Sequence, residues 1–189
     1  MGFLDHFRSI FTSPVGRRSA VPATAPDDTR DERRRRQRRN PKEGTTILLI
    51  DDSPTILTAL KRILRSAGCV TLEAPDAEQG LEIAARQTPH LIFLDIVLPG
   101  MNGFAALRQL RRDPATRDIP VIMMSGNEQA TEQFFGTRIG ADDFMKKPFS
   151  RFEVFARIER LLDETDVPRR LPRPDEPAPV SRSAALQSS

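Results

Sequence analysis

The chain has 189 residues, with 29 lysines and arginines, 26 acidic side chains and a single cysteine. This length allows one domain of ordinary size with flanking segments, and no apolar run approaches the ~20 residues of a membrane span. Asp5, His6 and Arg8 interrupt the beginning, which excludes a secretory signal, and the lone Cys69 excludes an internal disulfide and is typical of a reducing compartment. We therefore expect a cytoplasmic protein.

The positive charge is concentrated near the amino terminus. Residues 1–44 hold 11 basic and 6 acidic side chains, whereas residues 45–165 hold 14 and 17. Neutralisation of phosphates supplies most nucleic-acid affinity, so the mildly acidic central part is a poor nucleic-acid binder. The composition predicts a disordered basic arm at 12–44 and a disordered proline-rich tail at 166–189, which leaves one folded domain at 45–165.

Residues 1–11 would form an amphipathic helix. Its apolar side would consist of Phe3, Leu4, Phe7, Ile10 and Phe11. Such a helix could dock weakly into a partner groove or onto an anionic membrane. It could equally be a frayed end without a function, and both interpretations stay open.

Short apolar runs alternate with helical patterns through the central part. The expected strands are residues 46–50, 69–74, 90–94, 119–124 and 143–145. The expected helices follow Ser53-Pro54, Asp76, Gly103, Glu128 and Ser150, the last of them ending at about residue 163. Buried strands that alternate with helices predict an α/β fold with a parallel sheet. In the helix after Asp76 we expect Ala77, Leu81, Ala84 and Ala85 to be buried.

Four of the apolar runs end on a reactive group. These groups are Asp51 and Asp52, Asp95, Ser125 and Lys147. The carboxyl ends of parallel strands share one edge of a sheet, so we expect these side chains to converge. Carboxylates at this density suit Mg²⁺, and a metal with an ammonium group suits phosphoryl transfer onto a carboxylate. Asp95 stands alone at its strand end and is the expected nucleophile, with Asp51 and Asp52 holding the metal.

These residues lie in motifs that resemble one family. The motifs are Ile50-Asp51-Asp52-Ser53, Leu94-Asp95-Ile96-Val97-Leu98-Pro99-Gly100-Met101-Asn102-Gly103, Met124-Ser125-Gly126 and Gly140-Ala141-Asp142-Asp143-Phe144-Met145-Lys146-Lys147-Pro148-Phe149. In this order and at these separations, residues 45–162 resemble the receiver domain of bacterial response regulators, close to the chemotaxis regulators. The resemblance implies a doubly wound, flavodoxin-like fold with five parallel strands in the order 2-1-3-4-5.

The resemblance also implies roles for individual residues. Asp95 would accept a phosphoryl group from a histidine kinase or a phosphotransfer domain. Mg²⁺ would bind Asp52, Asp95 and the Val97 carbonyl, and Asp51 would act largely through water. Ser125 and Lys147 would bind the phosphoryl oxygens. Ser125 and Phe144 would form the switch, although Phe144 lacks the hydroxyl of the more familiar tyrosine. No enzymatic turnover is expected beyond self-phosphorylation and slow loss of the phosphoryl group.

The resemblance further suggests how the signal leaves the domain. Fewer than thirty residues follow Leu162, so we expect a stand-alone receiver without a DNA-binding domain, whose output is binding to another protein. The expected output surface consists of the last two helices and the fifth strand, with Phe144 and Phe152 as candidate contacts. The run at residues 132–141 is similar to the twitching-motility (type IV pilus) regulators.

Two interpretations from other classes are also considered. A phosphatase of the haloacid-dehalogenase type needs a second Asp two residues after its nucleophile, but Val97 and Ser53 stand at those places after Asp95 and Asp51. Neither side chain can act as an acid, so turnover of a phosphate ester is not expected. Alternatively, the protein is a scaffold or tether that acts through its basic arm, with the receiver in a regulatory role.

Overall fold

The computed structural model describes residues 39–136 and 140–170, and its strands form one parallel sheet. The elements are β1 (Thr46–Ile50), α2 (Pro54–Arg65), β2 (Val70–Ala74), α3 (Ala77–Gln87), β3 (Leu91–Asp95), α4 (Gly103–Arg112), β4 (Val121–Ser125), α5 (Glu128–Gly136), β5 (Asp143–Lys146) and α6 (Arg151–Glu159). The strand order is β2-β1-β3-β4-β5, and every neighbouring pair is parallel. The predicted doubly wound α/β fold is confirmed.

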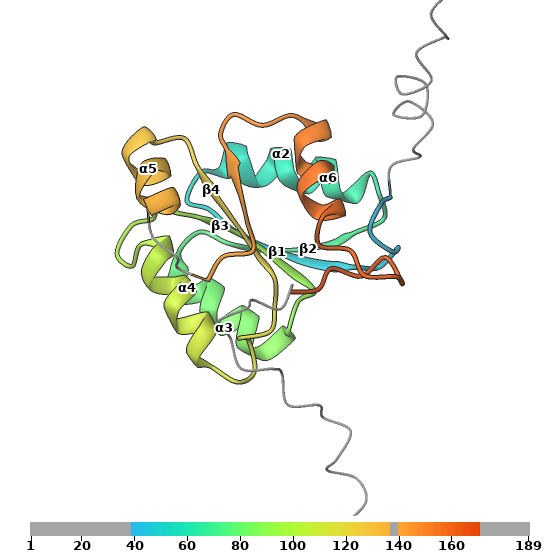
Figure 1. The fold of residues 1–189 in the computed structure, drawn as a ribbon, viewed down its shortest axis with the longest axis horizontal. Coiled ribbons are helices and arrows are strands. Elements are labelled where there is room, and N and C mark those ends of the chain that lie inside the picture. Colours follow the sequence, from blue (N-terminus) through green and yellow to red (C-terminus); the bar gives the residue numbers. More distant parts are fainter. Residues whose placement is uncertain (1–38, 137–139, 171–189) are drawn as a thin grey trace, which may run out of the picture. The chain divides into compact units, whose positions relative to one another are not determined.

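Helices cover both faces of the sheet. Figure 1 shows α2 and α6 on one side of the strands and α3 and α4 on the other. The strands β3 and β4 are buried along their whole length, as expected for central strands with helices on both faces. Their alternate residues therefore serve two separate cores.

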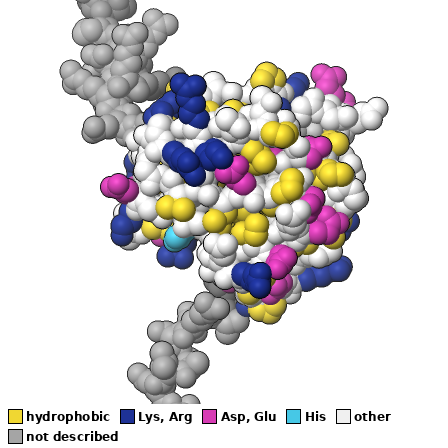
Figure 2. Space-filling model, turned by 180° about the vertical axis from the view of Figure 1, so that it is seen from behind, with side chains coloured by type: hydrophobic (Ala, Val, Ile, Leu, Met, Phe, Trp, Pro, Cys, Tyr) yellow, Lys and Arg dark blue, Asp and Glu magenta, His cyan; other side chains and the backbone are white. Residues whose placement is uncertain are grey.

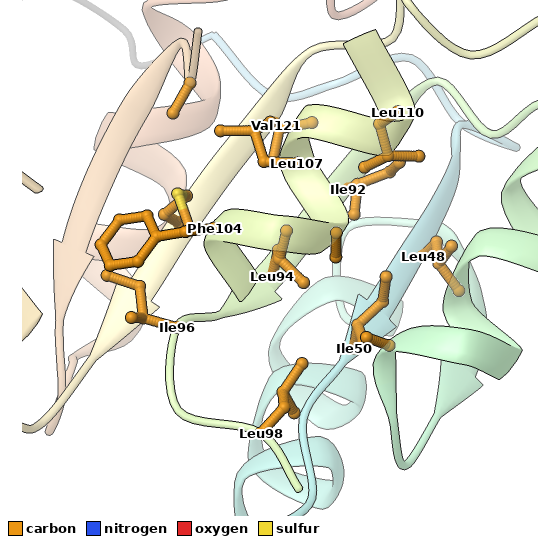
Figure 3. Close-up of a cluster of buried hydrophobic side chains, with 14 of the residues drawn as sticks. Leu48, Ile50, Ile92, Leu94, Ile96, Leu98, Phe104, Leu107, Leu110 and Val121 are labelled. Atoms are coloured by element: carbon orange, nitrogen blue, oxygen red, sulfur yellow. The ribbon is translucent and has the colours of Figure 1, made fainter. Parts of the chain in front are cut away.

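The core between the sheet and α3 and α4 is drawn in Figure 3. Leu48 and Ile50 of β1, Leu94 of β3, and Leu107 and Leu110 of α4 belong to this core, and all five side chains are almost completely buried. Each such side chain stabilises the fold by about 1.5–3 kcal/mol relative to an exposed one. The opposite core, against α2 and α6, contains Leu49, Leu60, Phe93, Met124, Val154 and Phe155. The two cores hold the carboxyl ends of the strands at a common edge.

Side chains placed just before four of the helices satisfy free backbone amides. Ser53, Asp76, Asn102 and Ser150 are the N-caps of α2, α3, α4 and α6, and each accepts a hydrogen bond from the amide three residues later. Such caps contribute about 1 kcal/mol each. Pro54 at the start of α2 fits because this position needs no amide donor.

Several predicted boundaries are wrong by one or two residues. The fourth strand begins at Val121 and not at residue 119, because Pro120 has no amide hydrogen to join the ladder. The third strand runs one residue further than expected and includes Asp95. Ala85 is exposed instead of buried, since it follows Ala84 by about 100° around α3.

The end of the folded part also differs from the prediction. Helix α6 ends at Glu159, before the expected residue 163, and the chain then continues as a packed loop to residue 170. The domain end expected at 165 lies inside this loop, because proline content alone does not reveal its tertiary contacts. The predicted helix at 1–11, most of the basic arm, and the tail beyond residue 170 lie outside the described residues.

Among the described helices, none combines the length and the apolar character of a membrane span. On the face drawn in Figure 2, apolar and acidic side chains are interspersed, and the basic side chains form no continuous field. This agrees with the mildly acidic balance of residues 45–165.

Candidate functional site

The predicted site residues lie at the carboxyl edge of the sheet. Asp51 and Asp52 directly follow β1, Asp95 ends β3, Ser125 ends β4 and Lys147 directly follows β5. Although β3 and β4 lie between β1 and β5, the residues that follow β1 and β5 come together at this edge. The parallel register aligns Asp95 with Met124 and Ser125 with Lys146, which brings the strand ends level.

One lysine contacts two of the carboxylates. Nζ of Lys147 lies 2.6 Å from Oδ2 of Asp51 and 2.8 Å from Oδ2 of Asp95. All three side chains are shielded from water, so their attraction is stronger than that of a surface pair. The amide of Ser53 donates to Oδ1 of Asp51 at 3.0 Å, which fixes the orientation of that carboxylate.

The three aspartates could hold a divalent cation. One carboxylate oxygen from each of Asp51, Asp52 and Asp95 lies within 4.8 Å of the others, with Asp52 exposed and the other two buried. Oδ2 of Asp51 is close to Lys147, yet it has no hydrogen bond of suitable geometry to any described group. An all-oxygen donor set of three carboxylates fits Mg²⁺, which binds a few carboxylates and keeps several waters.

Asp95 has a perturbed acidity. Burial is the main cause that raises its pKa above the ordinary value of 3.8, and the neighbouring negative charge of Asp51 adds to the rise. The hydrogen bond from Lys147 and its positive charge lower the pKa but do not cancel the effect. The amide of Val97 also donates to Oδ1 of Asp95, at 3.3 Å. The result is a basic, oriented carboxylate in a site where the charge of a bound metal cation would relieve the repulsion.

Ser125 is buried at the end of β4 and is engaged with the following loop. Its Oγ accepts a hydrogen bond from the Asn127 amide at 3.0 Å and lies 3.4 Å from the Asn127 carbonyl oxygen. Asn127 in turn accepts from the Ala130 amide in the first turn of α5. The hydroxyl of Ser125 is thus linked to the beginning of α5, and among the described residues both of its hydrogen bonds go to Asn127.

Gly103 contributes to the site in a way that sequence reasoning missed. We expected it only to begin a helix, but an added Cβ would lie 2.1 Å from the carbonyl oxygen of Asp95 and 2.9 Å from Cα of Ile96. Helix α4 therefore packs directly against the backbone that carries Asp95. The signal available in the sequence was the position of the glycine eight residues after this aspartate.

The expected switch residue Phe144 lies away from the acidic cluster, among other rings. It is buried in β5, with its ring centroid 4.8 Å from that of Phe134 and 5.5 Å from that of Phe135. Phe135 is 74% exposed. Lys146 is exposed, whereas the side chain of the adjacent Lys147 is largely buried, as expected where successive residues point in opposite directions.

A five-stranded parallel sheet with three carboxylates and a lysine at its carboxyl edge is the arrangement expected of a receiver domain. The family described as "Response regulator receiver domain" matches residues 47–159, which is more than half of the chain. The chain therefore belongs to the response regulator receiver family, and the resemblance noted in the sequence is confirmed.

Similar proteins include regulators of different overall length. The chain is 41% identical over 120 residues to the DNA-binding dual master transcriptional regulator RpaA of Synechocystis, covering 64% of this chain and 50% of RpaA. It is 38% identical over 116 residues to Protein PilH of Pseudomonas aeruginosa, covering 61% of this chain and 96% of PilH. The chain thus spans about half the length of RpaA and nearly all of PilH.

A solved structure with a bound metal is also similar. It is the receiver domain of the sensor histidine kinase PA1611 from Pseudomonas aeruginosa, with a magnesium ion coordinated in its active site cleft. It is 32% identical, has a TM-score of 0.56, and the alignment covers 62% of this chain and 95% of that domain. Receiver domains bind Mg²⁺ at their acidic site, and this chain contains the corresponding acidic cluster.

Proposed function

We propose that the protein accepts a phosphoryl group on Asp95 from a histidine kinase or a phosphotransfer domain. A carboxylate oxygen of Asp95 attacks the phosphorus while the bond from phosphorus to the histidine nitrogen of the donor breaks. The electron pair of that bond stays on the imidazole, which takes a proton from water. The observation that supports this most is the position of Lys147, within 2.8 Å of Asp95 and next to Asp51.

The residues of this chain supply orientation and charge for that step. The amide of Val97 holds the Asp95 carboxylate, and the ammonium of Lys147 is placed to bind an equatorial phosphoryl oxygen. Mg²⁺ held by Asp51, Asp52 and Asp95, with the Val97 carbonyl as a further ligand, would neutralise charge on the phosphoryl oxygens. Ser125 would release its contact with Asn127 and donate to the phosphoryl group.

The proposed chemistry is tested with acetyl phosphate as a small phosphoryl donor. With Mg²⁺ present, intact-mass spectrometry is expected to detect one added phosphoryl group on the full chain and none on Asp95→Asn. The phosphoprotein should lose the group slowly by hydrolysis, without turnover of other phosphate esters. Equal incorporation in Asp95→Asn and the wild type would refute the assignment of the acceptor.

We further propose that the output is phosphorylation-dependent binding to another cytoplasmic protein. The face formed by α5, β5 and α6 includes the exposed Phe135, which lies beside the buried Phe144, and the exposed Phe152 of α6. Phosphorylation would shift an existing equilibrium between two arrangements of this face. The likeness to nearly the whole of PilH supports a role of the pilus or twitching-motility type, and a chemotaxis-like role is the close alternative. Since the match covers half of RpaA, it supports receiver chemistry and not the DNA binding in that protein's name.

A second candidate function rests on the basic amino-terminal arm. Arg33–Arg36 with Arg38 and Arg39 could attach the protein to an acidic partner, with the receiver as a regulator. Deletion of residues 2–37 separates the two, because it removes most of the arm but spares Arg39, which contacts the folded part. A pull-down with beryllofluoride-treated protein should still capture the output partner if the receiver carries the function. Loss of capture by the deletion variant would favour the tether.

A further inference from the structure

Residues 160–170, here named the C-terminal extension, are packed onto the receiver although the family match ends at residue 159. The extension folds back on itself: the amide of Arg169 donates to the Leu161 carbonyl at 2.7 Å, and the amide of Asp163 donates to the Val167 carbonyl at 3.0 Å. The Asp163 carboxylate accepts hydrogen bonds from Thr165, Val167 and Arg169. These contacts lower the pKa of Asp163, with the Thr165 hydroxyl as the largest cause.

The extension ends in a buried ion pair. Nε of Arg170 lies 3.4 Å from Oδ1 of Asp142, and the two side chains are 10% and 3% exposed. Nη1 of Arg170 also donates to the Arg117 carbonyl at 3.2 Å. Oδ2 of Asp142 accepts from the Val121 amide at 2.7 Å and from Arg111 at 2.9 Å. The Asp142 carboxylate thus pairs with two guanidinium groups and accepts a hydrogen bond from one backbone amide, which fixes its position.

Asp142 occupies a sensitive position, because it directly precedes β5. This strand has four residues, lies at the edge of the sheet and pairs only with β4. Lys147 directly follows the other end, about 16 Å away at the usual rise per residue. A short edge strand has few ladder hydrogen bonds, so the groups at its two ends contribute strongly to its position along β4.

We propose that the C-terminal extension fixes β5 through the pair Arg170–Asp142 and thereby places the ammonium of Lys147 against Asp95. Arg170 is then a positioning residue that lies beyond the region matched by the family. This inference rests on the proposed function, since its consequence is measured on phosphoryl transfer. The inference adds to the proposed function that residues at the amino-terminal end of β5 influence phosphoryl transfer at its carboxyl end.

A second ion pair of the extension offers a matched control. Arg39 pairs with Asp166 at 2.6 Å, but these side chains are 44% and 45% exposed. Exposed pairs contribute little to stability, whereas loss of one partner from a buried pair has larger local effects. Within the described part of the chain, the polar contacts of Arg39 are with Glu159, Asp163 and Asp166, and none is with β5. Its removal should therefore leave Lys147 in place.

The experiment compares Arg170→Gln, Arg170→Lys and the control Arg39→Gln in the full chain. Arg111 still pairs with Asp142 in Arg170→Gln, so we expect this variant to fold. Three quantities are measured: the rate of phosphorylation by acetyl phosphate, the affinity for Mg²⁺ by calorimetry, and hydrogen exchange of the Lys147 amide. This amide donates to the Ser125 carbonyl at 2.8 Å and reports on the end of β5.

We expect Arg170→Gln to slow phosphorylation roughly tenfold, because a displacement well below 1 Å at a reacting group has effects of this order. Exchange of the Lys147 amide should accelerate, and Mg²⁺ affinity should be unchanged or higher, since the metal ligands lie on β1 and β3. Arg170→Lys should recover part of the rate, and Arg39→Gln should behave as the wild type.

Three outcomes would overturn the inference. The first is a wild-type phosphorylation rate in Arg170→Gln. The second is an Arg170→Gln protein that loses phosphorylation rate and Mg²⁺ affinity together, because this indicates general damage to the fold. The same conclusion follows if Arg170→Gln does not fold and Arg170→Lys loses both rate and Mg²⁺ affinity. The third is an equal effect of Arg39→Gln. Absence of phosphorylation in the wild type would instead refute the proposed function, and the two failures are thus distinguishable.

Discussion

Nζ of Lys147 lies 2.8 Å from Oδ2 of Asp95, although 52 positions separate the two residues in the chain. The same ammonium lies 2.6 Å from Asp51, so one cation serves two buried carboxylates. It offsets the repulsion between them, and it is also the cation nearest to an incoming phosphoryl oxygen in the proposed reaction. Removal of the Lys147 charge should therefore affect the affinity for Mg²⁺ and the rate of phosphoryl transfer differently.

Replacement of Lys147 by Gln should slow phosphorylation by acetyl phosphate about 10²-fold, the usual loss when one group that stabilises transition-state charge is removed. The affinity for Mg²⁺ should stay the same or rise, because the carboxylates lose a competing cation. Lys146→Gln is the control, since this neighbour is exposed and its nearest carboxylate is Glu128, at 3.8 Å. Equal rates in the two variants would contradict the role of Lys147.

Replacement of Asp95 by Asn should stabilise the fold near neutral pH. The pKa of Asp95 is raised by burial and by Asp51, so its ionisation opposes folding, and this cost is present above the folded-state pKa. As pH falls through that pKa toward the unfolded value of about 4, the carboxyl becomes protonated and the difference from Asn should vanish. Urea unfolding of both proteins across this pH range measures the effect.

An exposed aspartate gives the reference for this experiment. The Asp118 side chain is largely exposed, so Asp118→Asn should change the free energy of unfolding by less than about 0.5 kcal/mol. An Asp95→Asn protein that is less stable than the wild type at pH 7 would show that the contact with Lys147 outweighs burial.

Replacement of Gly103 by Ala should destabilise the protein by about 1–3 kcal/mol, as expected when a methyl group is forced into a packed site. The new Cβ would meet the carbonyl oxygen of Asp95 at 2.1 Å, so α4 or the acceptor backbone must shift. Phosphorylation should slow as well. Gly136→Ala is the matched control, because among the described residues no atom outside its chain neighbours and its own helix backbone lies within 4 Å of the added group, so this change should be neutral or slightly stabilising. Similar chemical denaturation midpoints for the two variants would refute the argument.

Two variants in the aromatic cluster of Phe134, Phe135 and Phe144 distinguish a role in core packing from a role in partner binding. Phe144→Ala should cost about 3–5 kcal/mol, because Phe144 is almost fully buried against other rings. Phe135→Ala should change stability far less, since Phe135 is 74% exposed. If the face of α5, β5 and α6 is the output surface, Phe135→Ala should nevertheless weaken capture of the partner by beryllofluoride-treated protein. Unchanged capture would move the output surface elsewhere.

The elements and the chemical types at the site could be predicted from local patterns. Apolar runs followed by Asp51, Asp95 or Ser125 mark strand ends, and caps such as Ser53 and Asp76 mark helix starts. The boundary errors, as at Pro120, arose where a backbone hydrogen bond and not side-chain polarity decides the end of a strand. The exposure of Ala85 was missed because a single alanine carries little information about which side of a helix it faces.

The sequence by itself determined an α/β domain with carboxylates, a hydroxyl and a lysine at the ends of its strands, because periodicity and capping are local properties of the chain. Only the tertiary structure decided that Asp51 is buried beside Lys147 while Asp52 is exposed, that Gly103 packs against the Asp95 backbone, and that Arg170 meets Asp142. The contacts of Lys147 with Asp51 and of Arg170 with Asp142 join segments that are distant in the chain. Their geometry depends on strand register and helix packing, which no local pattern specifies.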